Sequence, residues 1–449
     1  MDLAAVEELR EDLDAFCAEV FASIPRQDSR ARGQCYLRGL MLDGRRKSIQ
    51  PMAERLPDGN MQALQQFVTS SPWDHTPVRR RIATQLTQAI DPEAWVIDDT
   101  SFPKVGNHSA GAVRQWCGAL GKKSLCQVGV ILHAVTDAAS VPLEWRLFLP
   151  KEWADPADPR RDRAGIPQEV GHREKWRLAL DMINAAQEWG LTEKVVVADA
   201  GYGQNHHFRE GLTRRGLDSV VAVRGDLNAH PDQALPWVSE RGGAQGPQPM
   251  PRHQDPARSL EELVIARGRA ALWCCTWRQG SRGSLRSRFV VMAVRPAGVA
   301  ATKAARVRAG GSRAWDGVLP PETLIAEWPP HHEAPTDYWL PVCPRTPCCG
   351  PWCVWPRSGG GSSTTTASSS TGSGWITTRA DLAGPAPPRH AGHRCSGLPH
   401  AAKTRPKSED VGLSLYQVLE TLQGVLLCWT GVCNTCYRPL AQQHPPDTS

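Results

Sequence analysis

Apolar residues near the N-terminus recur at steps of three and four positions, which is the spacing of one face of a helix. The first such stripe is Leu3, Val6, Leu9, Leu13 and Phe16. A further helix start lies in the segment WDHTPVRRRIATQL. The pattern predicts a helical domain over residues 1–90.

Two basic runs lie inside this helical segment. A charged run on a helix is ordinarily a solvated face, whereas two runs in one segment also fit contacts with phosphate groups. Both interpretations stay open. The second one assigns DNA contacts to Arg45, Arg46, Lys47, Arg79, Arg80 and Arg81.

From about residue 92 the pattern changes to short apolar runs that alternate with a helical stripe. Strands interleaved with helices predict an α/β sheet, here over residues 91–225. The helix is KWRLALDMINAAQEWGL. The expected strands are AWVIDDT, SLCQVGVILHAV, VPLEWRLFLP, KVVVADAGYG and SVVAVRG.

Residues 226–340 begin as a loop rich in proline and glycine and then become strand-like, which predicts a β-rich insertion. Its strand-like runs are ALWCCTW, RFVVMAV, TLIAEW and DYWL. Neither the helical nor the strand-like spacing of apolar residues continues through residues 341–405, which we expect to be irregular or disordered. An apolar helix, VGLSLYQVLETLQGVLLCW, is expected within residues 406–449.

The composition of the chain excludes few classes of protein. The net charge of +6 is compatible with a polyanionic partner, and no apolar run reaches the roughly 18 residues of a membrane span. The N-terminus lacks the pattern of a signal peptide, so we expect a cytoplasmic protein. Of the 14 cysteines, the late group Cys343, Cys348, Cys349 and Cys353 and the pair Cys433 and Cys436 allow a zinc-binding interaction protein as an alternative.

Acidic residues stand where two of the expected strands end. Asp98 and Asp99 follow one strand and Asp199 follows another. Carboxylates at strand ends suit Mg²⁺, and a pair of such ions about 4 Å apart supports phosphodiester chemistry. A strand-terminal Asp also commonly caps a turn or the next helix. The spacing of these acids does not decide between the two roles.

Longer motifs around these acids resemble one family in order along the chain. They are YLRGLMLDGRRKSIQPMAERLPDGNMQALQQFVTSSPWD, DDTSFPKVGNHSAGAVRQWCGALGK, VPLEWRLFLPKEWADP, KWRLALDMINAAQEWG, VVADAGYGQNHHFREGL, PTDYWL and GLSLYQVLETL. The chain resembles bacterial insertion-sequence transposases of the DDE class, over residues 30–340 and again over 410–440. The resemblance implies a ribonuclease-H-like catalytic core. Asn107 departs from the family, which usually has lysine there.

Carried over by residue, the resemblance makes Asp99 the first catalytic carboxylate and Asp199 the second. Asp98 is the alternative first metal ligand. The implied cofactor is Mg²⁺ or Mn²⁺, and the partners are double-stranded DNA at transposon ends and target, with no membrane. The number of subunits stays open, with a homodimer as one arrangement. The loop after Asp99 adds polar residues that would contact DNA or remain surface groups: Lys104, His108, Arg114 and Gln115. Tyr202 would pack in the core or stack on a base.

The family's third carboxylate is missing. It is a glutamate in a helix resembling RWRIEHDYRELK after the YWL strand, but no Asp or Glu occurs between Asp337 and Asp381. We wrote a set of codons for that family helix and translated them starting from the second base. The result is the sequence of residues 359–369, and the glutamate codon of the helix is then split between Ser362 and Ser363. We interpret residues 341–405 as frame-shifted. A genuine linker is the alternative, and a non-catalytic DNA-binding remnant is the alternative function.

Overall fold

The computed structural model describes residues 3–42, 47–136, 139–238, 250–280 and 283–342. Contacts divide the described chain after Ile82 into two compact units. The predicted segments 341–405 and 406–449 therefore lie outside the described residues, apart from positions 341 and 342. None of the described helices combines the length and hydrophobicity that crossing a bilayer requires.

The described residues of the first unit form helices. Phe67 and Trp73 stack with ring centroids 5.0 Å apart, and the Trp73 indole N–H donates to the Phe67 carbonyl. Val20 and Ile24 are buried beside them in the same cluster. The helices are α1 (Leu3–Phe21), α2 (Gln27–Met41), α3 (Ile49–Ala53), α4 (Met61–Thr69) and α5 (Thr76–Ile90), the last of which spans the division between the units.

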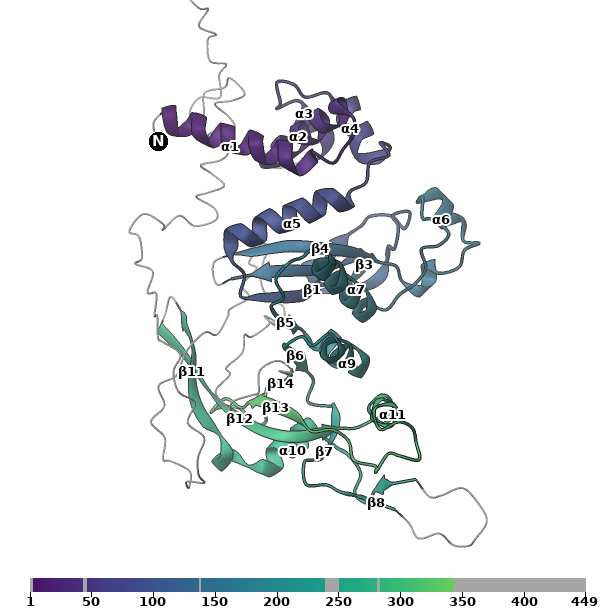
Figure 1. Ribbon diagram of the computed structural model, residues 1–449, viewed down its shortest axis with the longest axis vertical. Coiled ribbons are helices and arrows are strands. Elements are labelled where there is room, and N and C mark those ends of the chain that lie inside the picture. The colour runs from purple at the N-terminus through teal and green to yellow at the C-terminus, as the bar shows by residue number, and fades with distance from the viewer. Residues whose placement is uncertain (1–2, 43–46, 137–138, 239–249, 281–282, 343–449) are drawn as a thin grey trace, which may run out of the picture. The chain divides into compact units, whose positions relative to one another are not determined.

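The second unit is organised on one mixed sheet of twelve strands within the described residues (Figure 1). The strand order is β10-β7-β12-β13-β14-β6-β5-β1-β3-β2, with β11 paired to β12 and β4 paired to β3. The strands are β1 (Ala94–Pro103), β2 (Val113–Cys117), β3 (Lys122–Val135), β4 (Ser140–Phe148), β5 (Val195–Ala198), β6 (Ser219–Val223), β7 (Asn228–Pro231), β10 (Arg258–Ser259), β11 (Trp273–Gly280), β12 (Gly283–Pro296), β13 (Glu322–Glu327) and β14 (Asp337–Val342).

Helices cover the sheet and form the main core with it. Trp95 and Ile97 of β1 point to one face and are fully buried against Ile183 of α7 and Phe208 of α9. The helices of this unit are α6 (Pro159–Arg163), α7 (Lys175–Glu188), α8 (Ala200–Gly203), α9 (His206–Arg214), α10 (Leu260–Arg267) and α11 (Val299–Arg308). Such a mixed α/β layer arrangement fits the ribonuclease-H-like class that the motifs imply.

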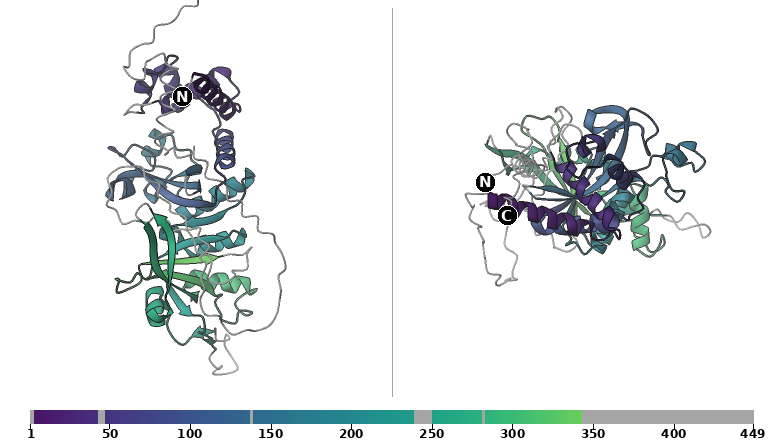
Figure 2. Two further views of the ribbon diagram at one scale, coloured as in Figure 1. Left: turned by 90° about the vertical axis from the view of Figure 1, so that its left-hand side faces the viewer. Right: turned by 90° about the horizontal axis from the view of Figure 1, so that it is seen from above.

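The strands expected in the insertion belong to the same sheet as the core. β14 pairs antiparallel with β6, and β13 and β12 follow in order, so the sheet continues without a break. The β11–β12 hairpin forms a long ribbon, visible in Figures 1 and 2. A separate two-stranded sheet joins β8 (Pro236–Trp237) to β9 (Arg252–His253).

Two features of this unit differ from the sequence-based expectation. β1 does not end at its acids but continues to Pro103, because β3 remains paired with it through Cys126. The segment called β-rich also contains α10 and α11. α10 begins with a capping box, in which Ser259 and Glu262 each accept from the other's backbone N–H. α11 is rich in alanine and carries no clear apolar stripe, so its pattern does not stand out in the sequence.

Candidate active site

The acidic residues predicted as catalytic meet at one edge of the central sheet. β1 and β5 are parallel, and their ladder ends at the pair Ile97 and Ala198. Asp98 and Asp99 follow directly in β1, and Asp199 follows directly after β5. β1 itself continues beside β3, but because β1 and β5 run in the same direction, the residues that follow their last pair lie next to each other. The sheet topology therefore brings together carboxylates that are about 100 residues apart in the sequence.

Asp99 is held by two side chains from the helices beside the sheet. The Tyr202 hydroxyl donates to its Oδ1 at 2.5 Å, and the Lys175 ammonium lies 2.5 Å from its Oδ2. Tyr202 belongs to α8 and Lys175 is the first residue of α7. Because successive residues of a strand point to opposite faces, Asp99 shares the face of Ile97 and of these helices. Its orientation is therefore fixed before any ligand arrives.

Asp199 caps the short helix that follows β5. Its Oδ1 accepts a hydrogen bond from the backbone N–H of Tyr202 at 3.3 Å. The capping role left open by the sequence is thus present, and it orients the carboxylate at the sheet edge. Burial, and then the negative charge of Asp99, raise the pKa of Asp199 above its ordinary value.

Asp98 carries a further negative charge at the same edge. Its Oδ1 accepts from the backbone N–H of Asp99 at 2.7 Å. Although its surface is partly open to solvent, the surrounding protein removes much of its hydration. This desolvation, with smaller contributions from Asp199 and Asp99, raises the pKa of Asp98 to about 6. Burial is thus the main cause of the raised pKa of both Asp98 and Asp199, and the neighbouring carboxylates add to it.

The donor set fits a divalent cation with oxygen ligands. Mg²⁺ is usually bound by one or two carboxylates and keeps several waters and substrate phosphates, which matches Asp99 and Asp199 with Asp98 nearby. Within the described ranges, no three His, Cys, Asp or Glu side chains form a preformed metal cage. The late cysteines of the zinc alternative lie outside those ranges.

Replacing Asp98 by Asn is expected to raise thermal stability at neutral pH and to change little in acid. The folded-state pKa lies above the ordinary Asp value of 3.8, so stability contributed by this group is lost as pH rises toward about 6 and stays lost above it. Asn carries no charge, so the variant does not lose this stability as the pH rises. Thermal melts across a pH series measure the effect, which we expect to be small because Asp98 is partly exposed. A larger gain in acid than at neutral pH would contradict this account.

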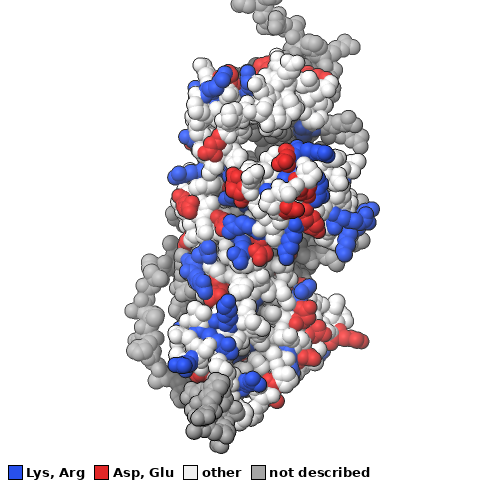
Figure 3. All heavy atoms as spheres, turned by 90° about the vertical axis from the view of Figure 1, so that its right-hand side faces the viewer, with Lys and Arg blue, Asp and Glu red and all other residues white. Residues whose placement is uncertain are grey.

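The other residues predicted to contact DNA are spread over several elements. Lys104 follows β1, His108 is exposed in the next turn, and Arg114 is exposed on β2 rather than in a loop. In the N-terminal region, Arg80 is exposed on α5 and the Lys47 ammonium donates to the Leu42 carbonyl. On the face shown in Figure 3, basic and acidic side chains are interspersed rather than gathered into one basic field. Arg79 and Arg81 are half-buried on α5. The Gln115 side-chain amide donates a hydrogen bond to the Cys126 carbonyl. Arg45 and Arg46 lie outside the described residues.

Sequence reasoning missed Lys175 as part of the site. A signal was present, because a lysine in the first turn of a helix opposes the helix dipole. Its position is explained by the pairing with Asp99. Tyr202 lies in the core, one of the two positions considered from the sequence, at 3 % exposure and beside the Phe208 ring. Its hydroxyl also donates a hydrogen bond to Asp99.

Comparisons with known proteins identify the family of the chain. Residues 19–284 match the model of the DDE superfamily endonucleases, which is more than half of the chain. The chain is also similar to a protein of Microchaete diplosiphon described as a probable transposase for insertion sequence element IS701. The two are 29% identical over 191 residues, which is 42% of this chain and 47% of that protein. The chain thus spans about half the length of this curated relative. Because the family model matches more than half of the sequence, the chain belongs to the DDE superfamily endonucleases.

Proposed function

We propose that the chain is an insertion-sequence transposase. Its family reaction would be hydrolysis at the transposon ends, followed by attack of the freed 3′-hydroxyl on target DNA. The observation that carries the proposal is the meeting of Asp99 and Asp199 at one sheet edge, with their charges in mutual repulsion. The partners would be double-stranded DNA at the ends and at the target, in the cytoplasm, and a homodimer is one arrangement in which the protein could act.

In this proposal each acidic residue has a defined task. Asp99 and Asp199 would hold the Mg²⁺ or Mn²⁺, with Asp98 beside them. A bound ion of this kind activates the attacking oxygen and steadies the leaving oxygen of the phosphodiester. Tyr202 keeps Asp99 oriented through its hydroxyl proton, and Lys175 balances the charge of Asp99 before the ion binds.

The domain assignment extends the same proposal along the chain. Residues 1–90 would bind DNA through their basic runs, residues 91–225 would form the catalytic core, and residues 226–340 would be the insertion that precedes the third acid. Since no Asp or Glu stands between Asp337 and Asp381, we propose that this copy binds DNA but is catalytically deficient. Losing one ligand of a metal site lowers the rate of the chemical step by several orders of magnitude.

The test is an end-cleavage assay of the full chain with Mg²⁺ or Mn²⁺, using DNA that carries the ends of the element. Cleavage far below that of an intact family member, together with retained binding to the ends, is the expected result. If residual cleavage occurs, Asp199→Ala is expected to abolish it. A chain that binds no DNA overturns the proposal, and stoichiometric zinc in metal analysis would favour the interaction protein instead.

A further inference from the structure

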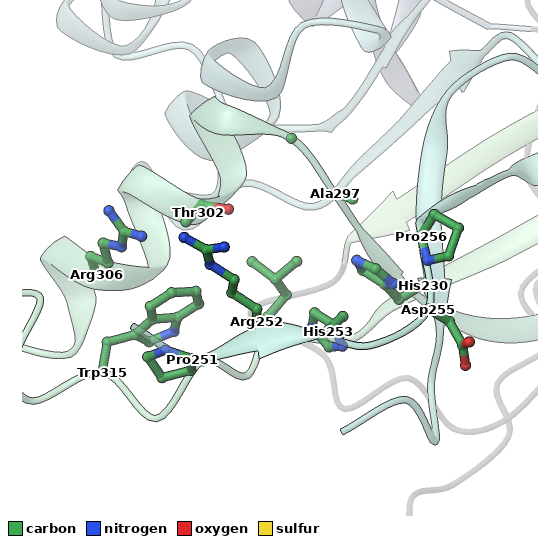
Figure 4. Close-up of a pocket in the computed structure, with 13 residues that line it drawn as sticks. His230, Pro251, Arg252, His253, Asp255, Pro256, Ala297, Thr302, Arg306 and Trp315 are labelled. Carbon is green, nitrogen blue, oxygen red and sulfur yellow. The ribbon is translucent and has the colours of Figure 1, made fainter. Parts of the chain in front are cut away.

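A cavity of about 280 Å³ lies beside β7 of the large sheet, and Figure 4 shows the residues that line it. His230 of β7, Arg252 and His253 of β9, and Trp315 line it together with the start of α11. In the sheet order, β12, β13, β14 and β6 separate β7 from β5. The cavity is therefore distinct from the acidic edge.

The N-terminus of α11 opens on this cavity without a capping side chain. Gly298 is the N-cap residue and lines the cavity, and no acidic residue occupies the first turn. The first backbone N–H groups of a helix have no partner within the helix, and the helix dipole favours negative charge beside them. This end of α11, which is ten residues long, therefore attracts an anion.

Buried polar side chains in the cavity wall lack partners as well. His230 is only 8% exposed, and its Nδ1 accepts or donates no hydrogen bond among the described residues. Both ring nitrogens of His253 and the Nε of Arg306 are also buried and have no hydrogen-bond partner among the described residues. An unpaired buried polar group costs about 1–3 kcal/mol. Such groups around one cavity indicate that a polar ligand completes their bonding.

The charge and geometry of the wall suit a phosphate group. Figure 4 shows the guanidinium of Arg252 directed toward Thr302 and Arg306 on α11, whereas the carboxylate of Asp255 points away. Arg306 is held 5.1 Å above the Trp315 ring, so its orientation is fixed. Arginine and a helix N-terminus are the common donors to phosphate in proteins.

The two histidines add neutral donors. Their rings stack with centroids 3.9 Å apart. Burial, followed by the charge of the neighbouring His253, lowers the pKa of His230, and burial followed by the charge of Arg295 lowers the pKa of His253. Neutral imidazoles each retain one N–H that can donate to a phosphate oxygen.

We propose that this cavity binds a phosphate group of the DNA backbone, through Arg252, Arg306, His230 and the first turn of α11. The assignment rests on the proposed function, because it takes DNA as the source of the phosphate. It adds an anchoring point on the insertion, away from the acids. A free phosphate ion is the other source of the same chemistry.

The experiment compares Arg252→Gln and Thr302→Asp with the wild-type full chain, and uses Arg267→Gln as a matched control. Arg267 is an exposed arginine at the last turn of α10 and does not line the cavity. Duplex DNA binding is measured by fluorescence anisotropy over a salt series, and inorganic phosphate binding is measured by calorimetry. Circular dichroism melts establish that each variant folds.

Loss of one phosphate contact is expected to make the slope of log affinity against log salt shallower by about 0.9 in Arg252→Gln. The carboxylate of Thr302→Asp is expected to weaken DNA binding by at least about tenfold. Arg267→Gln should match the wild type. Unchanged DNA binding by both cavity variants overturns the proposal, and if phosphate binding alone is lost, the site takes free phosphate instead. A wild-type chain that binds no DNA removes the proposed function, while the phosphate titration still reports on the cavity.

Discussion

Restoring the reading frame across residues 341–405 is expected to raise cleavage of transposon-end DNA by several orders of magnitude. In the frame-shift interpretation, the restored segment would carry a helix resembling RWRIEHDYRELK, and its glutamate codon would be the one split between Ser362 and Ser363. That glutamate would supply the third carboxylate. Asp99 and Asp199 would then share the task of holding the metal with a third ligand instead of holding it alone.

The size of this effect follows from the chemistry of the edge. Lys175 and the Tyr202 hydroxyl already engage both oxygens of Asp99, and the backbone N–H of Tyr202 engages one oxygen of Asp199. Few carboxylate oxygens therefore remain for an ion in the chain as written. A third carboxylate adds both ligand atoms and a negative charge, which strengthens binding of a divalent cation and orders the reacting groups.

Single-turnover cleavage under identical metal concentrations measures the difference between the restored and the written chain. A restored chain in which the recovered glutamate is replaced by glutamine is the control, since it keeps the helix and removes the charge. We expect this control to cleave as slowly as the written chain. Equal rates for all three chains, or a locus that sequences without a one-base slip, would refute the frame-shift interpretation.

Local pattern was sufficient to predict the elements that position the acids. The apolar runs of β3, β4 and β5 and the stripe of α7 stand where the sequence placed them, because a short apolar run between turns is typical of a strand and a stripe at three- and four-residue steps is typical of a helix. β2 was missed since its residues alternate only weakly between apolar and polar. α10 and α11 were missed since neither carries a pronounced apolar stripe.

Long-range pairing was beyond the reach of the sequence pattern. The antiparallel pairing of β14 with β6 joins the insertion to the core sheet, and nothing in either strand specifies its neighbour. The contact between Lys175 and Asp99 is of the same kind, because it joins residues 76 positions apart. The acids themselves were predictable because they directly follow the buried runs of β1 and β5. Their roles remain predictions.

In the chain with the restored reading frame, Asp99→Asn is expected to lower the rate of DNA cleavage by about a thousandfold or more. Asp98→Asn is expected to lower this rate by much less. The two residues are adjacent and the substitutions are isosteric, so each is the matched control for the other. Asp99 lies on the face of Tyr202 and Lys175, and its charge interacts with Asp199. Asp98 points to the opposite face of β1 and holds a backbone N–H.

Binding of Mn²⁺ provides a second measurement that does not depend on turnover. Asp99→Asn should weaken Mn²⁺ binding strongly because it removes a charged ligand, while Asp98→Asn should leave most of the affinity in place. The reverse ranking in both measurements would make Asp98 the metal ligand and Asp99 an anchor for Lys175 and Tyr202. Equal losses would instead mean that both carboxylates contact the ion, which the shared edge of the sheet also permits. The ranking of these two substitutions thus decides which face of β1 carries the chemistry.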